Sequence, residues 1–195
     1  FFRWAQQTFQ MACRLLCFCV SLLPLGLAFK CPGSGAFIHA WCEVTVLTSA
    51  HCLDAMAEMK ARASSDGKWP DPHHGGHYKL LASSENQLWT QRTANPLKSV
   101  GGQAYLDKQI VTFNRNNEGG CRIEACSESQ STSIFDFSTN YCNMRNLYCG
   151  VADGCRPLVK DFTNEEVEIK ASVGAGTDSS KCLVPDVVDV ITVVS

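Results

Sequence analysis

The sequence predicts an α+β fold in which one N-terminal helix packs on a curved antiparallel sheet of about four to five strands, stapled by disulfides. Three observations predict it: a strand followed at once by a helical apolar face, a series of short alternating segments separated by turns, and 12 cysteines in 195 residues. A helix with one apolar face must bury it against another layer. Short strands without helices between them are typical of an antiparallel meander.

The front of the chain predicts a secretory signal peptide at residues 11–28. Met11 is followed by one positive charge and by an uncharged apolar run over residues 15–29, which is the layout of such a peptide. A transmembrane anchor needs about 20 apolar residues, whereas this run is shorter and contains Pro24. Small residues lie near its end, and we expect cleavage after Ala28.

The expected organisation has four parts: an upstream remnant (1–10), the signal peptide (11–28), one globular domain (29–182) and a C-terminal tail (183–195). The mature length of about 167 residues suffices for a single domain with its own core. The tail is rich in valine. We expect it to form an edge strand or an extension outside the fold.

The cysteines indicate an oxidising compartment. Three fall in the signal peptide, and nine remain as disulfide candidates: Cys31, Cys42, Cys52, Cys121, Cys126, Cys142, Cys149, Cys155 and Cys182. Such a density in an exported chain indicates disulfides. An odd number means that at least one is a free thiol or pairs with a partner chain. The spacing leaves the connectivity open, and no C-x-x-C pair favours structural zinc.

Charge excludes some classes of partner. After removal of Arg3 and Arg14 the chain keeps 15 basic against 19 acidic residues, a net charge of −4. Without a basic stripe, nucleic acid is not an expected partner. No polybasic or amphipathic segment predicts a stable membrane anchor once the signal is removed.

The first elements follow from periodicity. Residues 36–48 predict a strand because apolar side chains alternate from Ile38 to Val46. Residues 50–63 predict an amphipathic helix, since apolar residues recur at spacings of three and four. A loop rich in proline and glycine follows over residues 64–76.

Four short strands are then expected, over residues 77–82, 87–93, 108–114 and 121–127. Residues 127–149 predict a partly helical segment held by cysteines. A last strand is expected within residues 159–171, where Glu165, Glu166 and Glu168 favour a solvated edge. Cystatin-like and cone-shaped folds have a similar order of elements.

One motif resembles an enzyme. Residues 46–52 read Val-Leu-Thr-Ser-Ala-His-Cys and resemble the L-T-A-A-H-C segment around the catalytic histidine of trypsin-like serine proteases. The resemblance implies that His51 is a general base and Cys52 half of a disulfide. That family takes its serine nucleophile from a G-D-S-G-G segment, which this chain lacks. We therefore assign no catalytic residue, and interpret the motif as a strand end and a helix start.

A histidine-rich loop is the candidate metal site. His73, His74 and His77 could bind zinc or copper with Asp71 as a fourth ligand. Adjacent prolines and glycines favour a solvated turn instead, so no metal and no cofactor are expected.

A second resemblance covers about a third of the mature chain. Residues 125–130, 136–142 and 146–149 read ACSESQ, DFSTNYC and NLYC. They resemble segments of small secreted cysteine-rich proteins of unicellular algae and related protists. The resemblance implies secretion and disulfides, but no activity.

The sequence thus predicts a secreted, non-enzymatic binding or structural domain whose ligand is a protein, a glycan or a small apolar molecule. A concavity of the sheet under the helix is the expected site, with these candidate lining residues: Trp41, Trp89, Tyr78 and Phe113. The alternative is a small secreted enzyme that uses His51, or a histidine of the 73–77 loop, with a carboxylate. A buried His51 beside an acidic group would favour it. A cystatin-like inhibitor would need a Gln-x-Val-x-Gly wedge, which the chain lacks.

Overall fold

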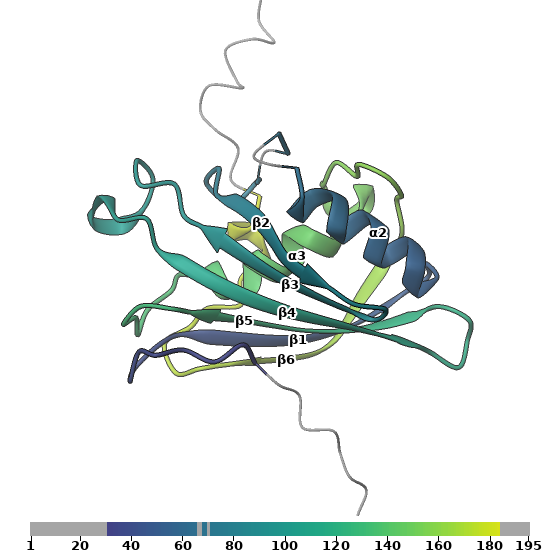
Figure 1. The fold of residues 1–195 in the computed structure, drawn as a ribbon, viewed down its shortest axis with the longest axis horizontal. Helices are drawn as coiled ribbons and strands as arrows, with labels where there is room; N and C mark the ends of the chain where they lie inside the picture. The colour runs from purple at the N-terminus through teal and green to yellow at the C-terminus, as the bar shows by residue number, and fades with distance from the viewer. Residues whose placement is uncertain (1–30, 66–67, 70, 184–195) are drawn as a thin grey trace, which may run out of the picture.

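A six-stranded antiparallel sheet makes up most of the protein, in a computed structural model that describes residues 31–65, 68–69 and 71–183 (Figure 1). The strand order is β2-β3-β4-β5-β1-β6. Two short helices, α2 and α3, lie over one face. The elements are β1 (Trp41–Thr48), α2 (Cys52–Ala63), β2 (His77–Ser83), β3 (Gln87–Thr93), β4 (Leu106–Arg115), β5 (Cys121–Ser129), α3 (Thr139–Tyr148) and β6 (Asn164–Ala171).

The predicted α+β architecture, with one N-terminal helix on four to five strands, is wrong. The sheet dominates the described chain, has six strands and carries two short helices. The difference arises at β1, which pairs with β5 on one side and with β6 on the other. Because both edges of β1 are hydrogen-bonded, β6 joins the same sheet as the meander. The cystatin-like and cone-like comparisons, which rested on the same element order, are corrected with it.

The meander itself is confirmed. Strands β2, β3, β4 and β5 lie side by side in sequence order, each antiparallel to the next. The first strand begins later than predicted, at Trp41, and the helix begins at Cys52. The predicted signal peptide, residues 1–10 and the valine-rich part of the tail lie outside the described residues.

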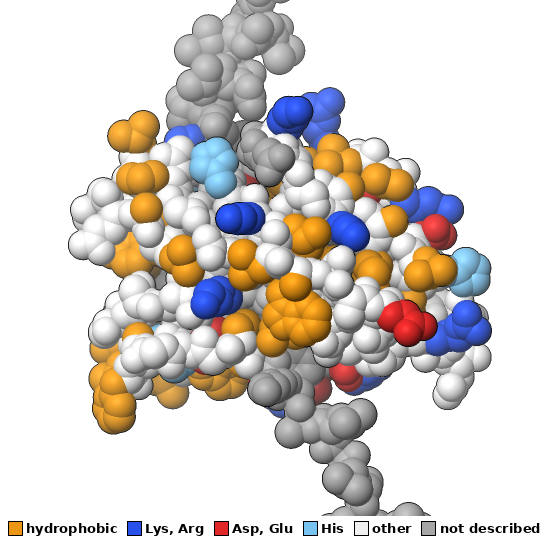
Figure 2. All heavy atoms as spheres, in the orientation of Figure 1, with side chains coloured by type: hydrophobic (Ala, Val, Ile, Leu, Met, Phe, Trp, Pro, Cys, Tyr) orange, Lys and Arg blue, Asp and Glu red, His pale blue; other side chains and the backbone are white. Residues whose placement is uncertain are grey.

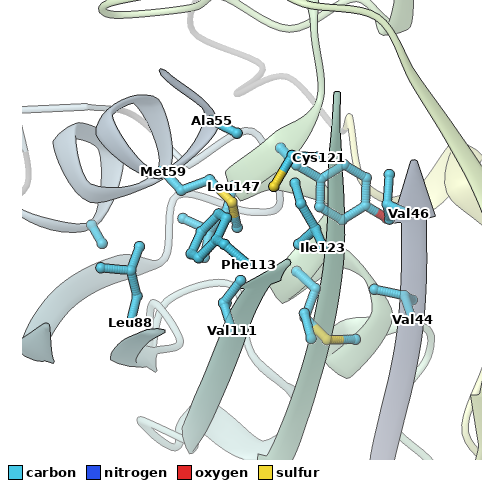
Figure 3. Packing of buried hydrophobic residues seen from close by; sticks show 14 of the residues in the cluster. Val44, Val46, Ala55, Met59, Leu88, Val111, Phe113, Cys121, Ile123 and Leu147 are labelled. Carbon is cyan, nitrogen blue, oxygen red and sulfur yellow. The ribbon is translucent and has the colours of Figure 1, made fainter. Parts of the chain in front are cut away.

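The core lies between the helices and the covered face of the sheet (Figure 3). It forms because alternate residues of each strand point to the same side. Each large side chain buried there stabilises the fold by about 1.5–3 kcal/mol. The central members are Val44, Val46, Ala55, Met59, Leu88, Val111, Phe113, Ile123 and Leu147, all at most 3% exposed.

Four disulfides staple this core. They are Cys31–Cys126, Cys52–Cys121, Cys142–Cys182 and Cys149–Cys155. The ninth candidate, Cys42, is a free thiol on β1 with no exposed surface. A bond from Cys42 to a partner chain would therefore require the core to open. Among the described residues, no helix has the length and apolar character to cross a membrane.

Candidate functional site

The two faces of the sheet place the candidate lining residues differently. Tyr78 and Phe113 point into the covered face and are 6% and 3% exposed. Both belong to the core under the helices. Trp41 and Trp89 are half-buried on the opposite, open face, which neither helix covers. The concavity under the helix is therefore filled by side chains, and the accessible aromatic groups lie on the other side of the sheet.

A shallow hollow of about 450 Å³ lies on the open face. Trp89 of β3 and Ile110 of β4 are direct cross-strand neighbours and form its floor. The apolar walls come from Leu81 and Ala82 of β2 and from Pro32. Trp41 is not among the lining residues. The hollow thus combines an indole with aliphatic side chains on three strands.

The wall that carries Pro32 is fixed in place by neighbouring bonds. Cys31 forms a disulfide with Cys126 of β5. The amide of Gly33 donates to a carboxylate oxygen of Glu128 at 2.5 Å. The residues before β1 are therefore bound across the open face, and the hollow is formed in the folded protein without further rearrangement.

Lys108 gives the hollow its charge. It is half-buried on β4 and lines the cavity. Its cross-strand neighbour Glu128 binds Gly33 and lies 2.6 Å from Nε2 of His39. Within the part of the chain that the structure describes, no carboxylate forms an ion pair with Lys108. An unpaired ammonium beside an apolar wall is available to a ligand anion.

A second hollow on the open face, of about 250 Å³, is lined mainly by charged groups. Arg122 pairs with Glu124 at 3.0 Å, and Lys170 pairs with Glu168 at 2.8 Å. Burial raises the pKa of the fifth charged group, Glu43. Because both cations already have carboxylate partners, this hollow offers little net charge to a ligand.

A polar layer runs along one side of α3, beside its apolar contacts with the sheet. Asn140, Asn143 and Asn146 recur at a spacing of three and are fully buried. Their side-chain amides donate to three carboxylates: Asn140 to Asp136 (3.0 Å), Asn143 to Asp107 (2.9 Å) and Asn146 to Asp71 (3.0 Å). Neither hollow reaches this layer. We therefore interpret it as a structural network, which the prediction of a partly helical segment over residues 127–149 did not reveal.

The histidine loop is bound to this network. Asp71 forms a buried ion pair with Arg92 at 2.6 Å and accepts the amides of His73 and Gly76. A Cβ on Gly76 would lie 2.4 Å from the guanidinium carbon of Arg92, so only glycine fits. His73 is buried and donates through Nδ1 to the carbonyl of Lys181 at 2.7 Å. Asp71 is therefore occupied by internal partners.

Within the described residues, no potential metal cluster includes His73, His74 or His77. His77 is exposed, and His74 adopts a left-handed backbone with φ of 60°. The one cluster with ligand-like spacing there joins Cys31, Glu43 and Cys126. Its two sulfurs form a disulfide, so they lack the thiolates that bind metal.

His51 lies at the start of α2, where its side chain is exposed and makes no capping hydrogen bond. A buried His51 beside a carboxylate would have favoured the enzymatic alternative, which could also use a histidine of the 73–77 loop. The described residues place no carboxylate in an ion pair with it. Cys52, next to it, pairs with Cys121, so the motif serves as a helix start and a staple.

Glu166 does not lie on a solvated edge, as the sequence predicted for it together with Glu165 and Glu168. It points to the covered face and accepts the hydroxyls of Tyr141 and Tyr148, each at 2.7 Å, and a bond from Arg145. Burial, reinforced by the Glu166 charge, raises the pKa of Tyr148. A register shift in the β1–β6 pairing turns Glu166 inward, a feature that strand alternation does not predict.

Comparison with protein-family models and with curated proteins finds no match to this chain. The choice of site therefore depends on which cluster is accessible and chemically incomplete. The asparagine layer, the histidine loop and the Glu166 cluster are occupied by internal partners. The hollow at Trp89 is accessible and contains Lys108, which forms no ion pair with another described residue.

Proposed function

We propose that this disulfide-rich domain acts outside the cell as a binding protein, and that the hollow at Trp89 takes a small amphipathic anion. The observation that carries the proposal is the unpaired, half-buried Lys108 beside the apolar wall of Trp89 and Ile110. A ligand with an apolar body and one acidic group matches both features. Small-molecule sites commonly combine apolar walls with a few placed polar groups.

The two parts of the hollow contribute differently. Contact with the indole face and the aliphatic wall removes apolar surface from water, which supplies most of the binding free energy. The ammonium of Lys108 selects the sign of the ligand charge, because it attracts an anionic group and repels a cationic one. The hollow is wide and shallow, so we expect affinities in the micromolar range rather than the nanomolar range.

The test is titration of the full chain with three ligands of equal alkyl length: a fatty acid, an alcohol and an amine. Indole fluorescence and calorimetry report binding. We expect the carboxylate to bind about tenfold more tightly than the alcohol and the amine not to bind. Trp89→Ala should weaken carboxylate binding by about tenfold or more. Lys108→Gln should remove the preference for the carboxylate while keeping alcohol binding.

Matched controls lie on the same face. Trp41→Ala removes a half-buried tryptophan that does not line the hollow, and Lys79→Gln removes an exposed lysine of β2. Both variants should bind as the parent protein does. Equal losses from Trp41→Ala and Trp89→Ala, or no binding of any of the three ligands, would contradict the proposal.

Extracellular location is tested separately. The four disulfides and the absence of a membrane-crossing helix among the described residues support it. Expression of the full chain in eukaryotic cells should release a product into the medium that begins at Phe29. Mass spectrometry without reduction should find four bridges. Retention in the cytosol with reduced cysteines would contradict secretion.

A further inference from the structure

One end of the sheet presents six large apolar side chains to solvent. We call this the apolar loop end; it comprises Phe37, Ile38, Ile134, Phe135, Phe137 and Val173, which are 48–98% exposed. They belong to the loops before β1, between β5 and α3, and after β6. Because β1 begins where the antiparallel β5 and β6 end, these loops meet at one end. Figure 2 shows hydrophobic side chains along this end, on the left of the view.

The three loops form one surface. The amide of Ser133 donates to the carbonyl of Ile38 at 3.1 Å. A Cβ on Gly174 would lie 2.6 Å from the carbonyl oxygen of Ile134, so the loop after β6 lies directly against the loop after β5. These contacts hold the three loops side by side, so the six exposed side chains project from one end of the sheet, and exposed apolar surface of this kind marks interaction sites.

The loops of this end carry almost no charge. Residues 32–38, 130–138 and 172–177 contain one charged residue, Asp136. Asp136 is 7% exposed, and its carboxylate accepts the amides of Ser138 and Gly176. Its charge is therefore turned inward. The next charged residue of the loop after β6, Asp178, is exposed, and its amide donates to the hydroxyl of Ser138 at 3.1 Å, so this end carries one exposed carboxylate beside its apolar tips.

The phenylalanine loop is held in an unfavourable conformation. Phe137 and Ser138 adopt φ of 51° and 71°, in the left-handed region that bulky residues avoid. Hydrogen bonds from Ser138 and Asn140 to Asp136 fix this turn, and Phe137 remains 69% exposed. This strained turn holds the ring of Phe137 in water, where the ring adds nothing to the core. A strained conformation without a gain in packing indicates a functional constraint on the loop.

We propose that the apolar loop end docks reversibly on a lipid surface, with Phe37, Phe135 and Phe137 inserted at the boundary of headgroups and acyl chains. Residues 32–38, 130–138 and 172–178 contain no cationic side chain and one exposed carboxylate, Asp178, which fits an electrically neutral lipid rather than an anionic one. Phe37 and Val173 are 98% and 95% exposed on separate loops, so they do not share a groove that a folded partner would fill. A fluid bilayer needs no matching pocket. Such docking requires no membrane-crossing segment, and it is independent of the hollow at Trp89.

The test is flotation of the full chain with vesicles of pure phosphatidylcholine. We expect binding that changes little between low and high salt, because hydrophobic insertion is not screened. Added phosphatidylserine should not strengthen it, since the chain carries a net charge of −2. Phe37→Ser and Phe135→Ser should each weaken binding by about tenfold or more, the effect of losing one buried ring. Both side chains are exposed, so thermal unfolding should be unchanged.

The matched control is Leu53→Ser, which removes an apolar side chain that is 75% exposed on α2, at the opposite end of the sheet. It should leave vesicle binding intact. Equal binding by the phenylalanine variants and the parent would overturn the proposal and would point to the apolar residues 15–29 instead. A dimer in sedimentation that Phe135→Ser dissolves, without vesicle binding, would also overturn it and identify a second copy as the occupant.

Discussion

Arg92 of β3 and Asp71 of the loop before β2 form an ion pair of 2.6 Å in which both side chains are at most 2% exposed. The same carboxylate accepts the side-chain amide of Asn146 from α3. One buried acid therefore connects a loop, a strand and a helix. The pair favours this arrangement of the loop, the strand and the helix, because each charge is costly to bury unless the other is present.

Removing one partner of this pair should be strongly destabilising. We expect Asp71→Ala to lower the free energy of unfolding by about 3–5 kcal/mol, since it leaves the guanidinium of Arg92 buried and uncompensated. Urea denaturation followed by circular dichroism measures the change. The control is Glu168→Ala, which breaks an exposed pair with Lys170 and should have little effect. Similar losses of unfolding free energy in the two variants would show that burial does not account for the effect of Asp71→Ala.

The histidine loop should make stability depend on pH. Burial, helped by the Arg92 charge, lowers the pKa of His73 from 6.5 to about 4. Between these values the unfolded chain binds more protons than the folded chain, so stability falls as the pH drops from 6.5 to 4 and then levels off. The size of this contribution is about 3 kcal/mol.

The measurement compares urea unfolding at pH 7 and pH 4.5 in the parent and in His73→Gln. The variant should lose most of the His73 contribution, while acidic groups contribute equally to both proteins. His77→Gln changes an exposed histidine and should keep the pH dependence of the parent. A parallel pH dependence in His73→Gln and the parent would contradict the assignment.

Local periodicity predicted the strands but not their partners. Val44 lies opposite Ala125 on one side and Ile169 on the other, and these pairings span 81 and 125 positions of the sequence. Alternation within β1 indicates only that one of its faces is buried. It does not reveal that both of its edges are bonded, so the place of β1 between β5 and β6 could not be derived from the sequence, although the strand at β6 was predicted.

The sequence could not assign the candidate lining residues to the two faces of the sheet, for the same reason. Trp89 and Tyr78 are both aromatic residues on short strands, and the sequence gives no sign of which face the helices cover. The structure buries Tyr78 and leaves Trp89 half-accessible. In α3, the threefold spacing of Asn140, Asn143 and Asn146 was visible in the sequence. An inward-facing polar stripe competes with the usual apolar periodicity, so the sequence predicted only a partly helical segment over residues 127–149, whose Phe135 and Phe137 are exposed.

The odd cysteine should be chemically inert in the folded protein. Burial, reinforced by the charges of Asp136, Glu166 and Glu43, raises the pKa of Cys42 to about 12. At neutral pH the group is therefore a thiol rather than the reactive thiolate. We expect residues 29–195, expressed without the segment before them, not to react with a thiol reagent such as dithionitrobenzoate, and to show one thiol per chain after unfolding in guanidinium. Rapid reaction of the native protein, absent in Cys42→Ala, would contradict this prediction.

The four disulfides should differ in their effect on stability according to the loops they close. Cys52–Cys121 joins the start of α2 to the start of β5 across 69 residues, whereas Cys149–Cys155 spans six. In the chain-entropy description, a bridge restricts the unfolded state more when its loop is longer. Replacing both cysteines by alanine should cost about 4 kcal/mol for the long loop and about 2 kcal/mol for the short one.

Guanidinium unfolding of the two double variants, each without added reductant, measures this difference. The short bridge also lies beside the buried side chain of Arg62. Arg62 donates to the carbonyl of Cys149 at 2.9 Å and to that of Asn146 at 2.7 Å. These bonds use backbone oxygens, so alanine at Cys149 and Cys155 should preserve them. If the short loop nevertheless costs as much as the long one, then the bridge acts in the folded state by positioning these carbonyls around the buried Arg62, and the entropic account does not describe this protein.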